Sequence, residues 1–192
     1  MSDTTQPPPL TDAQIRNRTI GELRPLSDKI LIVDSDPHWP ELFEREAARI
    51  RDSLGARAQR IEHVGSTSVP GLAAKPIIDI VLGVADPAHE LNYVPDLERA
   101  GYVLRIREIE WHQHRMLKRP GAAVHLHLFA AGCSEIDRML LFRNWLRSHP
   151  ADRDLYERTK RVLAEQEWKH AQNYADAKTA VVEEILGRAR RG

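Results

Sequence analysis

Three polar side chains lie inside apolar segments where strands are expected. Asp79 falls within the segment 77–84, and His125 and His127 fall within the segment 124–129. Side chains alternate between the two faces of a strand, so these two histidines share one face. A carboxylate and two imidazoles can bind a divalent metal ion such as Mg²⁺, Mn²⁺ or Zn²⁺. The residues predict that all three side chains face a common cleft as metal ligands, with Asp79 also a candidate catalytic residue.

Each of these residues also has a purely structural interpretation. Burying a carboxylate costs several kcal/mol unless it meets a cation or hydrogen-bond donors, so an ion pair of Asp79 with Lys75 or an arginine is an alternative. The two histidines are also compatible with a half-buried surface strand, because the sequence spacing fixes no third ligand near them. The polar segment 108–115 supplies more such groups, or forms a polar loop. The sequence leaves both interpretations open.

A candidate phosphate site precedes the strand that holds Asp79. The turn 65–68 is rich in hydroxyl groups and precedes a short helix expected over 69–74. Backbone N–H groups and hydroxyls at a helix N-terminus bind anions, although an ordinary capped turn has the same composition. Most lysines of the later helices are expected on solvated faces. The predicted phosphate-binding residues are Gly65, Ser66, Thr67, Ser68, Lys75, Arg115 and Arg143.

Hydrophobic periodicity predicts the elements that must position these residues. Strands are expected at 29–33, 60–64, 77–84, 102–106, 115–118 and 124–129. Helices are expected at 11–20, 40–54, 91–100 and from 134 to 190, the last broken once at Pro150. This order predicts an α/β (α+β) fold, in which a mixed β-sheet is flanked by helices and followed by a C-terminal helical layer. We expect an extended tail with a short helix over 1–26 and one domain over 27–192, with its sheet core at 27–130 and its helical part at 134–190.

Composition narrows the function classes. The chain has 192 residues, with 28 Lys and Arg against 28 Asp and Glu. This balance gives no global attraction to nucleic acid or to a membrane surface, so an RNA-binding role is disfavoured. The single cysteine excludes an internal disulfide, and no apolar segment approaches the roughly 20 residues that span a bilayer. These features, with no secretory signal pattern at the start, predict a cytoplasmic protein.

The segment around the candidate sites resembles a known family. The stretch IEHVGSTSVPGLAAKPIIDIVLGV is similar to the signature of the GrpB family, a branch of the nucleotidyltransferase-fold superfamily that includes polymerase-β-like enzymes. The resemblance continues through DPHWPELFEREAARI, LERAGY, HRMLKRP, VHLHLF, LLFRNWLRSHPADRDLYERTK and YADAKTAVVEEIL. It therefore covers most of the chain.

The resemblance implies a nucleotidyltransferase-type sheet and a metal–nucleotide site. In that superfamily a Gly-Ser turn precedes a strand with two carboxylates, and a later strand adds a third. Gly65 and Ser66 match the turn and Asp79 matches the first carboxylate, whereas Val81 stands at the second position and His125 or His127 at the third. The resulting ligand set is softer than Mg²⁺ prefers. In addition, Asn144 stands where the family commonly has aspartate.

Two functions follow from the resemblance. The first is binding of a nucleotide or another phosphorylated small molecule, with metal-dependent group transfer. The second is a catalytically inactive accessory or regulatory domain with a protein partner, since GrpB-like domains are also found fused to dephospho-CoA kinase.

Overall fold

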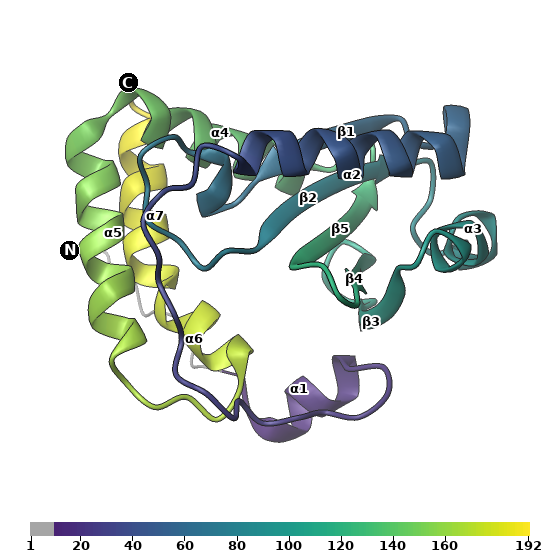
Figure 1. Ribbon diagram of the computed structural model, residues 1–192, viewed down its shortest axis with the longest axis horizontal. Helices are drawn as coiled ribbons and strands as arrows, with labels where there is room; N and C mark the ends of the chain where they lie inside the picture. Colours follow the sequence, from purple (N-terminus) through teal and green to yellow (C-terminus); the bar gives the residue numbers. More distant parts are fainter. Residues whose placement is uncertain (1–9) are drawn as a thin grey trace.

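The centre of the molecule is a five-stranded mixed sheet. The computed structural model describes residues 10–192 (Figure 1). The strands lie in the order β1 (Arg60–Val64), β2 (Ile78–Val84), β5 (Val124–Ala130), β4 (His114–Arg119) and β3 (Val103–Glu108). Strands β2 and β5 are parallel, and the other three neighbouring pairs are antiparallel.

One face of the sheet packs on helix α2 (Trp39–Leu54), which runs along the upper side in Figure 1. Its apolar residues recur three and four positions apart and so form one stripe, which lies on the alternate side chains of β2 and β5. Helix α3 (Val94–Arg99) extends the same layer, where Leu97 is buried. This face holds the main core, which includes Phe43, Ala47, Ile50, Ile80, Leu82, Leu126 and Leu128.

Apolar side chains of a helix cover only part of the opposite face of the sheet. Helix α4 (Ser134–Ser148) buries Ile136 and Leu140 against Val81 and Phe129. The side chains of Asp79, His125 and His127 on this face remain 29%, 25% and 24% exposed. The structure thus leaves a polar region of the sheet accessible beside the α4 contact.

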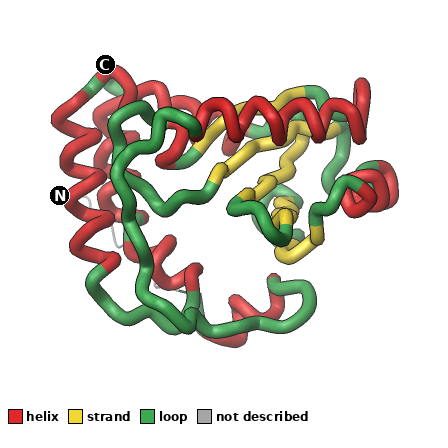
Figure 2. Tube along the Cα trace, in the orientation of Figure 1, coloured by secondary structure: helices red, strands yellow, loops and turns green. Residues whose placement is uncertain are grey.

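The C-terminal part is helical, as predicted. Helices α5 (Pro150–Ala164), α6 (Ala171–Ala177) and α7 (Thr179–Ala189) follow α4. Figure 2 shows these helices gathered on one side of the sheet. The break at Pro150 is confirmed, but the prediction of a single break is wrong, because the chain also leaves helical conformation after Ala164 and at Lys178. The predicted fold class, a mixed sheet flanked by helices with a C-terminal helical layer, is confirmed.

Two predicted elements are wrong. Residues 29–33 form no strand; only Val33 pairs with Ala74 in an isolated bridge, while Ile30 is buried beside Tyr174 of α6. The apolar pattern therefore reflects packing against helices. Residues 69–74 form no helix. A 3₁₀ turn, η2 (Ser66–Ser68), lies just before this segment. The other 3₁₀ turns of the described residues are η1 (Gly55–Arg57) and η3 (Glu90–Asn92).

The N-terminal segment packs against the sheet. Helix α1 (Asp12–Arg18) begins with a capping box at Thr11, which fits the predicted helix start. After it, the Ile20 N–H donates to the Arg105 carbonyl at 2.8 Å and Thr19 bridges Ile106. The extended tail predicted before this helix lies mostly outside the described residues. In the part of the chain that is described, no helix is both long and apolar enough to cross a membrane.

Candidate metal centre

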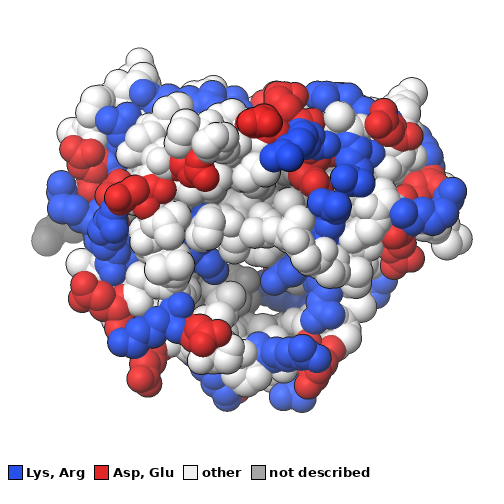
Figure 3. All heavy atoms as spheres, in the orientation of Figure 1, with Lys and Arg blue, Asp and Glu red and all other residues white. Residues whose placement is uncertain are grey.

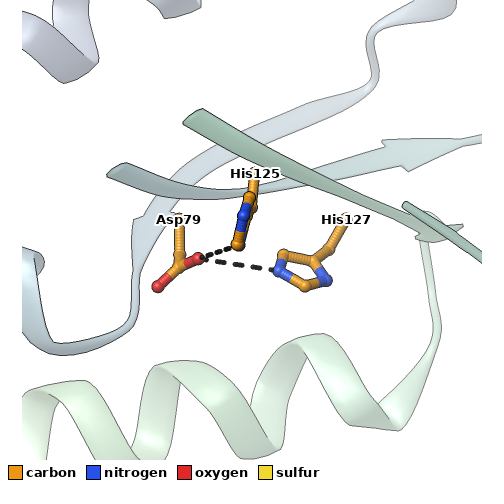
Figure 4. Close-up of side chains that lie close together, drawn as sticks. All are labelled: Asp79, His125 and His127. Carbon is orange, nitrogen blue, oxygen red and sulfur yellow. Dashed lines mark ion pairs between the residues drawn. The ribbon is translucent and has the colours of Figure 1, made fainter. Parts of the chain in front are cut away.

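The register of two parallel strands brings the predicted ligands together. Asp79 of β2 pairs with His125 of β5, and Val81 pairs with His127. The Asp79 carboxylate lies 3.4 Å from His125 Nδ1 and 3.8 Å from His127 Nε2 (Figure 4). The three side chains therefore lie close together on one face of the sheet, whereas their role as metal ligands in a common cleft stays a prediction. At the position of the superfamily's second carboxylate, Val81 is buried against α4.

The spacing of these atoms suits one small cation. One ligand atom from each residue lies within 4.8 Å of the other two. Ligands of a tetrahedral ion bound at about 2.0–2.1 Å are about 3.3 Å apart, so small side-chain movements complete the geometry. One carboxylate and two imidazoles are a softer ligand set than the oxygen ligands that Mg²⁺ prefers. Asp79, His125 and His127 thus form a group that could hold a metal ion.

Electrostatics keeps the ligands in their metal-binding forms. Burial works to raise the pKa of Asp79, but hydrogen bonds and charge interactions with His125 and His127 outweigh it and hold the pKa below its ordinary value. Burial lowers the pKa of His125, and Asp79 opposes this shift only in part. At neutral pH the carboxylate is ionised and the His125 ring is neutral, as metal binding requires.

A chain of hydrogen bonds supports His127 from behind. Glu108 of β3 accepts from His114 Nδ1 at 2.7 Å, and His114 Nε2 lies 3.1 Å from His127 Nδ1. Arg18 of α1 pairs with the other Glu108 oxygen at 2.5 Å. Burial works to raise the pKa of Glu108, but His114 and Arg18 outweigh it and lower this pKa. The sequence analysis identified the segment 108–115 as a source of polar groups. It did not predict the contacts of Glu108 with His114 and of His114 with His127, which depend on the strand register.

The hydrogen bonds from Glu108 through His114 to His127 determine which ring nitrogen of His114 carries the proton. The ionised Glu108 can only accept, so His114 carries its proton on Nδ1. Burial lowers the pKa of His114 to about 4, so the ring is neutral and its Nε2 accepts from His127 Nδ1–H. His127 Nε2 faces the Asp79 carboxylate at 3.8 Å. A hydrogen bond to the second ring nitrogen, like the one between His114 and His127, is typical of metal-bound histidine.

The glycine turn lies directly against Asp79. Gly65 has φ 69° and ψ −175°. A Cβ atom added there would lie 2.4 Å from Asp79 Oδ2. Only glycine permits both this backbone conformation and this close approach.

The hydroxyl groups of Thr67 and Ser68 form hydrogen bonds with other groups of the protein. Thr67 Oγ1 donates to the Ile77 carbonyl at 2.9 Å and lies 3.0 Å from His63 Nε2. Ser68 Oγ donates to the Gly65 carbonyl at 2.5 Å, and both Thr67 and Ser68 are buried. Because no helix follows, no helix N-terminus supports an anion at the turn. Gly65 and Ser66 are more exposed, whereas Thr67 and Ser68 line a cleft that Arg143 also lines.

The other predicted phosphate-binding residues lie in different places. Lys75 is half-buried, and Asp79 interacts with its charge. Arg115 is buried on the other face of the sheet, where it pairs with Glu90 at 2.5 Å. Strand alternation explains this position, since the neighbouring His114 faces His127. The structure does not bring Arg115 to the metal site.

Arg143 lies beside β1. It pairs with Glu62 at 3.0 Å and donates to the His63 carbonyl at 2.9 Å. Its Nε also donates to Asn144, so the asparagine at that position leaves the pair with Glu62 intact. Arg143 lines a cleft of about 760 Å³ that has none of the three metal-ligand candidates in its wall.

Sequence reasoning missed Lys160 of α5. The expectation of a solvated face is wrong here, because the residue is 2% exposed. Its ammonium donates to the Ala73 carbonyl and lies 4.8 Å from the centre of the Tyr156 ring. Burial, assisted by the charge of Lys178, lowers the pKa of Lys160 to about 7. Lys160 stands between Thr159 and Arg161, so the local sequence gives no signal for such burial.

Replacing Lys160 by methionine is expected to change how stability depends on pH. Below pH 7 the folded wild type holds a buried charge, whereas between about pH 7 and 10 it releases a proton that the unfolded chain retains. The wild type therefore gains stability over Lys160→Met as pH rises, by up to about 1.4 kcal/mol per pH unit. Urea unfolding from pH 6 to 9 measures this difference. The exposed Lys29→Met is the control, and parallel curves for Lys160→Met and wild type would contradict the prediction.

Comparisons with known proteins agree with the resemblance of the sequence. The GrpB protein profile matches residues 29–188. A UPF0157 protein of Halalkalibacterium halodurans is 56% identical over 189 residues, covering 98% of this chain and 97% of that protein. The crystal structure of the conserved protein GrpB from Enterococcus faecalis superimposes with a TM-score of 0.74 and 34% identity, covering 84% of this chain and 98% of that one.

A third relative contains a similar sequence within a longer protein. The dephospho-CoA kinase of Mycolicibacterium paratuberculosis is 32% identical over 181 residues, which cover 80% of this chain but 43% of that protein. The profile match spans the sheet, the metal-ligand candidates and the C-terminal helices. The chain belongs to the GrpB family.

Proposed function

We propose that this protein binds a divalent metal ion through Asp79, His125 and His127 and uses it to hold a nucleotide or another phosphorylated small molecule. The observation that carries the proposal is the convergence of the three ligand atoms, which all lie within 4.8 Å of one another. A bound metal ion neutralises charge on a phosphate oxygen and so favours group transfer. The protein's part is to fix the ligands, through Glu108 and His114 behind His127 and through Gly65 beside Asp79.

Metal selectivity tests the proposal. We expect Zn²⁺ or Mn²⁺ to raise the melting temperature more than Mg²⁺, because of the two imidazoles. Saturation at 100 times Kd adds about 2.7 kcal/mol of stability. For a chain of this size that corresponds to roughly 5–10 °C. Nucleoside triphosphates are expected to add a further shift only when the metal is present.

A pair of histidine variants provides the control. His127→Gln is expected to lose the metal-dependent shift. His89→Gln is expected to keep it, because the His89 side chain is 73% exposed and pairs only with the surface residue Asp86. No shift with any of the three metals at millimolar concentration, or an unchanged shift in His127→Gln, would show that these residues do not form a metal site.

A second candidate function is a catalytically inactive accessory or regulatory domain. It is favoured by the relative in which a region 32% identical to this chain makes up 43% of a dephospho-CoA kinase. The two functions separate in one experiment, since an accessory domain would bind a protein partner equally well with and without metal. Metal-dependent binding of a nucleotide to the isolated chain supports the first function.

A further inference from the structure

A row of four side chains connects the N-terminal helix to the metal-ligand candidates. Arg18 Nη1 of α1 donates to Glu108 Oε1 at 2.5 Å. The other oxygen of Glu108, Oε2, lies 2.7 Å from His114 Nδ1, and His114 Nε2 lies 3.1 Å from His127 Nδ1. The side chains of Glu108 and His114 are only 14% and 5% exposed. Each side chain therefore limits the rotation of the next, and Arg18 is the outermost member of the row.

Arg18 lies in a segment that the family profile does not include. The profile matches residues 29–188, so it contains Glu108, His114 and His127 but not Arg18. We call residues 10–28 the N-terminal strap. The alignment with the Halalkalibacterium halodurans protein covers 98% of this chain and therefore extends into the strap. The outermost contact of the row thus comes from outside the region that defines the family match.

The N-terminal strap runs from the C-terminal helices to the margin of the sheet and back. Lys169, which precedes α6, pairs with Asp12 at the start of the strap, and its carbonyl accepts from the Leu26 N–H at 2.9 Å. Between these contacts the Ile20 N–H donates to the Arg105 carbonyl of β3 at 2.8 Å. Figure 1 shows α1 on the lower side of the molecule, and Figure 3 shows a hollow above it with charged side chains of both signs at its margin. The strap thus forms one side of this hollow.

The docking of the strap is weak enough to respond to its polar contacts. Helix α1 has seven residues, of which only Ile15 is buried. A helix of this length is not stable by itself, because isolated helices shorter than about 12–15 residues are marginal in water. Segments with few buried apolar contacts open locally at a low cost in free energy. The pair of Arg18 with Glu108 therefore bears directly on whether the strap stays docked.

We propose that Arg18 is a positioning residue for the metal ligand His127, and that docking of the N-terminal strap and metal binding favour each other. The inference rests on the proposed function and adds a means of regulating the same site. When the strap leaves, Glu108 keeps only His114 of its two described partners, and the His127 ring is less firmly oriented. Contacts behind a metal ligand commonly change metal affinity about 10- to 100-fold. Because linkage is reciprocal, metal binding must favour the docked strap by the same factor.

Calorimetry with Mn²⁺ tests the positioning role in the full chain. Arg18→Gln is expected to lower Mn²⁺ affinity about tenfold, and Arg18→Lys, which keeps the charge but not the planar fork, should lose less. Arg16→Gln is the matched control, because Arg16 lies in the same helix, is exposed and forms no ion pair among the described residues, so its loss should leave the affinity unchanged. Hydrogen exchange measures the reciprocal effect. Saturating Mn²⁺ should slow exchange of the Ile20 amide about tenfold in the wild type but not in Arg18→Gln.

The outcomes separate this inference from the proposed function. Normal Mn²⁺ binding by the wild type, unchanged in Arg18→Gln, overturns the positioning role and keeps the metal site. An equal loss of affinity in Arg16→Gln and Arg18→Gln also overturns it, because net charge alone would then explain the effect. Weaker binding in Arg18→Gln, with Ile20 exchange that does not respond to Mn²⁺, keeps the positioning role and overturns the coupling to the strap. A wild type that binds no Mn²⁺ overturns both the proposed function and the inference.

Discussion

Replacing Asp79 by asparagine is expected to abolish metal binding and to leave the protein at least as stable as the wild type at pH 8. The amide removes the only negative ligand, so Mn²⁺ or Zn²⁺ affinity should fall on the order of 100-fold or more. Stability should not fall, because burying the carboxylate is costly and its nearest imidazole nitrogens, at 3.4 Å and 3.8 Å, lie beyond the usual hydrogen-bond distance. Residues at sites built for function commonly show this trade-off. Calorimetry with metal and thermal unfolding without metal measure the two effects.

The alternative interpretation of Asp79 predicts the opposite pair of results. If the carboxylate serves only as a structural ion pair with the imidazoles or with Lys75, its loss strands a partner and costs about 3 to 5 kcal/mol. Metal binding would then be weak in both proteins. Asp86→Asn is the matched control, because Asp86 also pairs with a histidine, His89, at 2.8 Å but is 48% exposed. A destabilised Asp79→Asn with unchanged ligand binding would end the metal-ligand interpretation.

Replacing Gly65 by alanine is expected to be the most destabilising single change near the site. The backbone conformation at φ 69° and ψ −175° is essentially restricted to glycine. The new Cβ would also lie 2.4 Å from Asp79 Oδ2 and 3.0 Å from Asp79 Cβ, so the strand or the carboxylate must move. Together these effects should cost roughly 3 kcal/mol or more and displace the metal ligand. Urea unfolding and metal titration detect both consequences.

Gly71→Ala separates backbone strain from the contact with Asp79. Gly71 also has a positive φ, 76°, but a Cβ there would meet nothing within 4 Å. Its replacement should cost about 1 to 2 kcal/mol and leave metal affinity unchanged. Equal loss of stability in the two variants, with metal binding retained in Gly65→Ala, would mean that the close contact with Asp79 does not constrain the site.

Much of the site was predictable because strand periodicity is local. The apolar residues around Asp79 and the alternation around His125 and His127 identify two strands and the shared face of the histidines. The sequence did not predict that β2 and β5 are neighbours; their parallel pairing in the structure brings the three side chains together. The prediction that Arg115 joins the phosphate site did not apply this rule, since alternation along β4 turns Arg115 to the face opposite His114, where it pairs with Glu90.

The features that the sequence did not predict depend on contacts between segments that are distant along the chain. The apolar run 29–33 has the composition of a strand, but the sequence does not reveal that Ile30 packs beside Tyr174. Similarly, Lys160 looks like a surface residue of an amphipathic helix until Ala73 and Tyr156 surround it. Glu108 and His114 acquire their role only through the pairing of β3 with β4 and of β4 with β5. Tertiary packing, rather than local preference, decided each of these cases.

The contacts of the N-terminal segment with β3 bear on how the sheet avoids self-association. A sheet with unpaired outer strands is a template for strand addition from another molecule. Here the Ile20 N–H and Thr19 occupy backbone groups of β3, and Arg143 occupies the His63 carbonyl on β1 at the opposite margin. The segment that carries Arg18 to Glu108 therefore also shields one margin of the sheet. Protection against aggregation and support of the candidate metal ligands are thus properties of the same short stretch of chain.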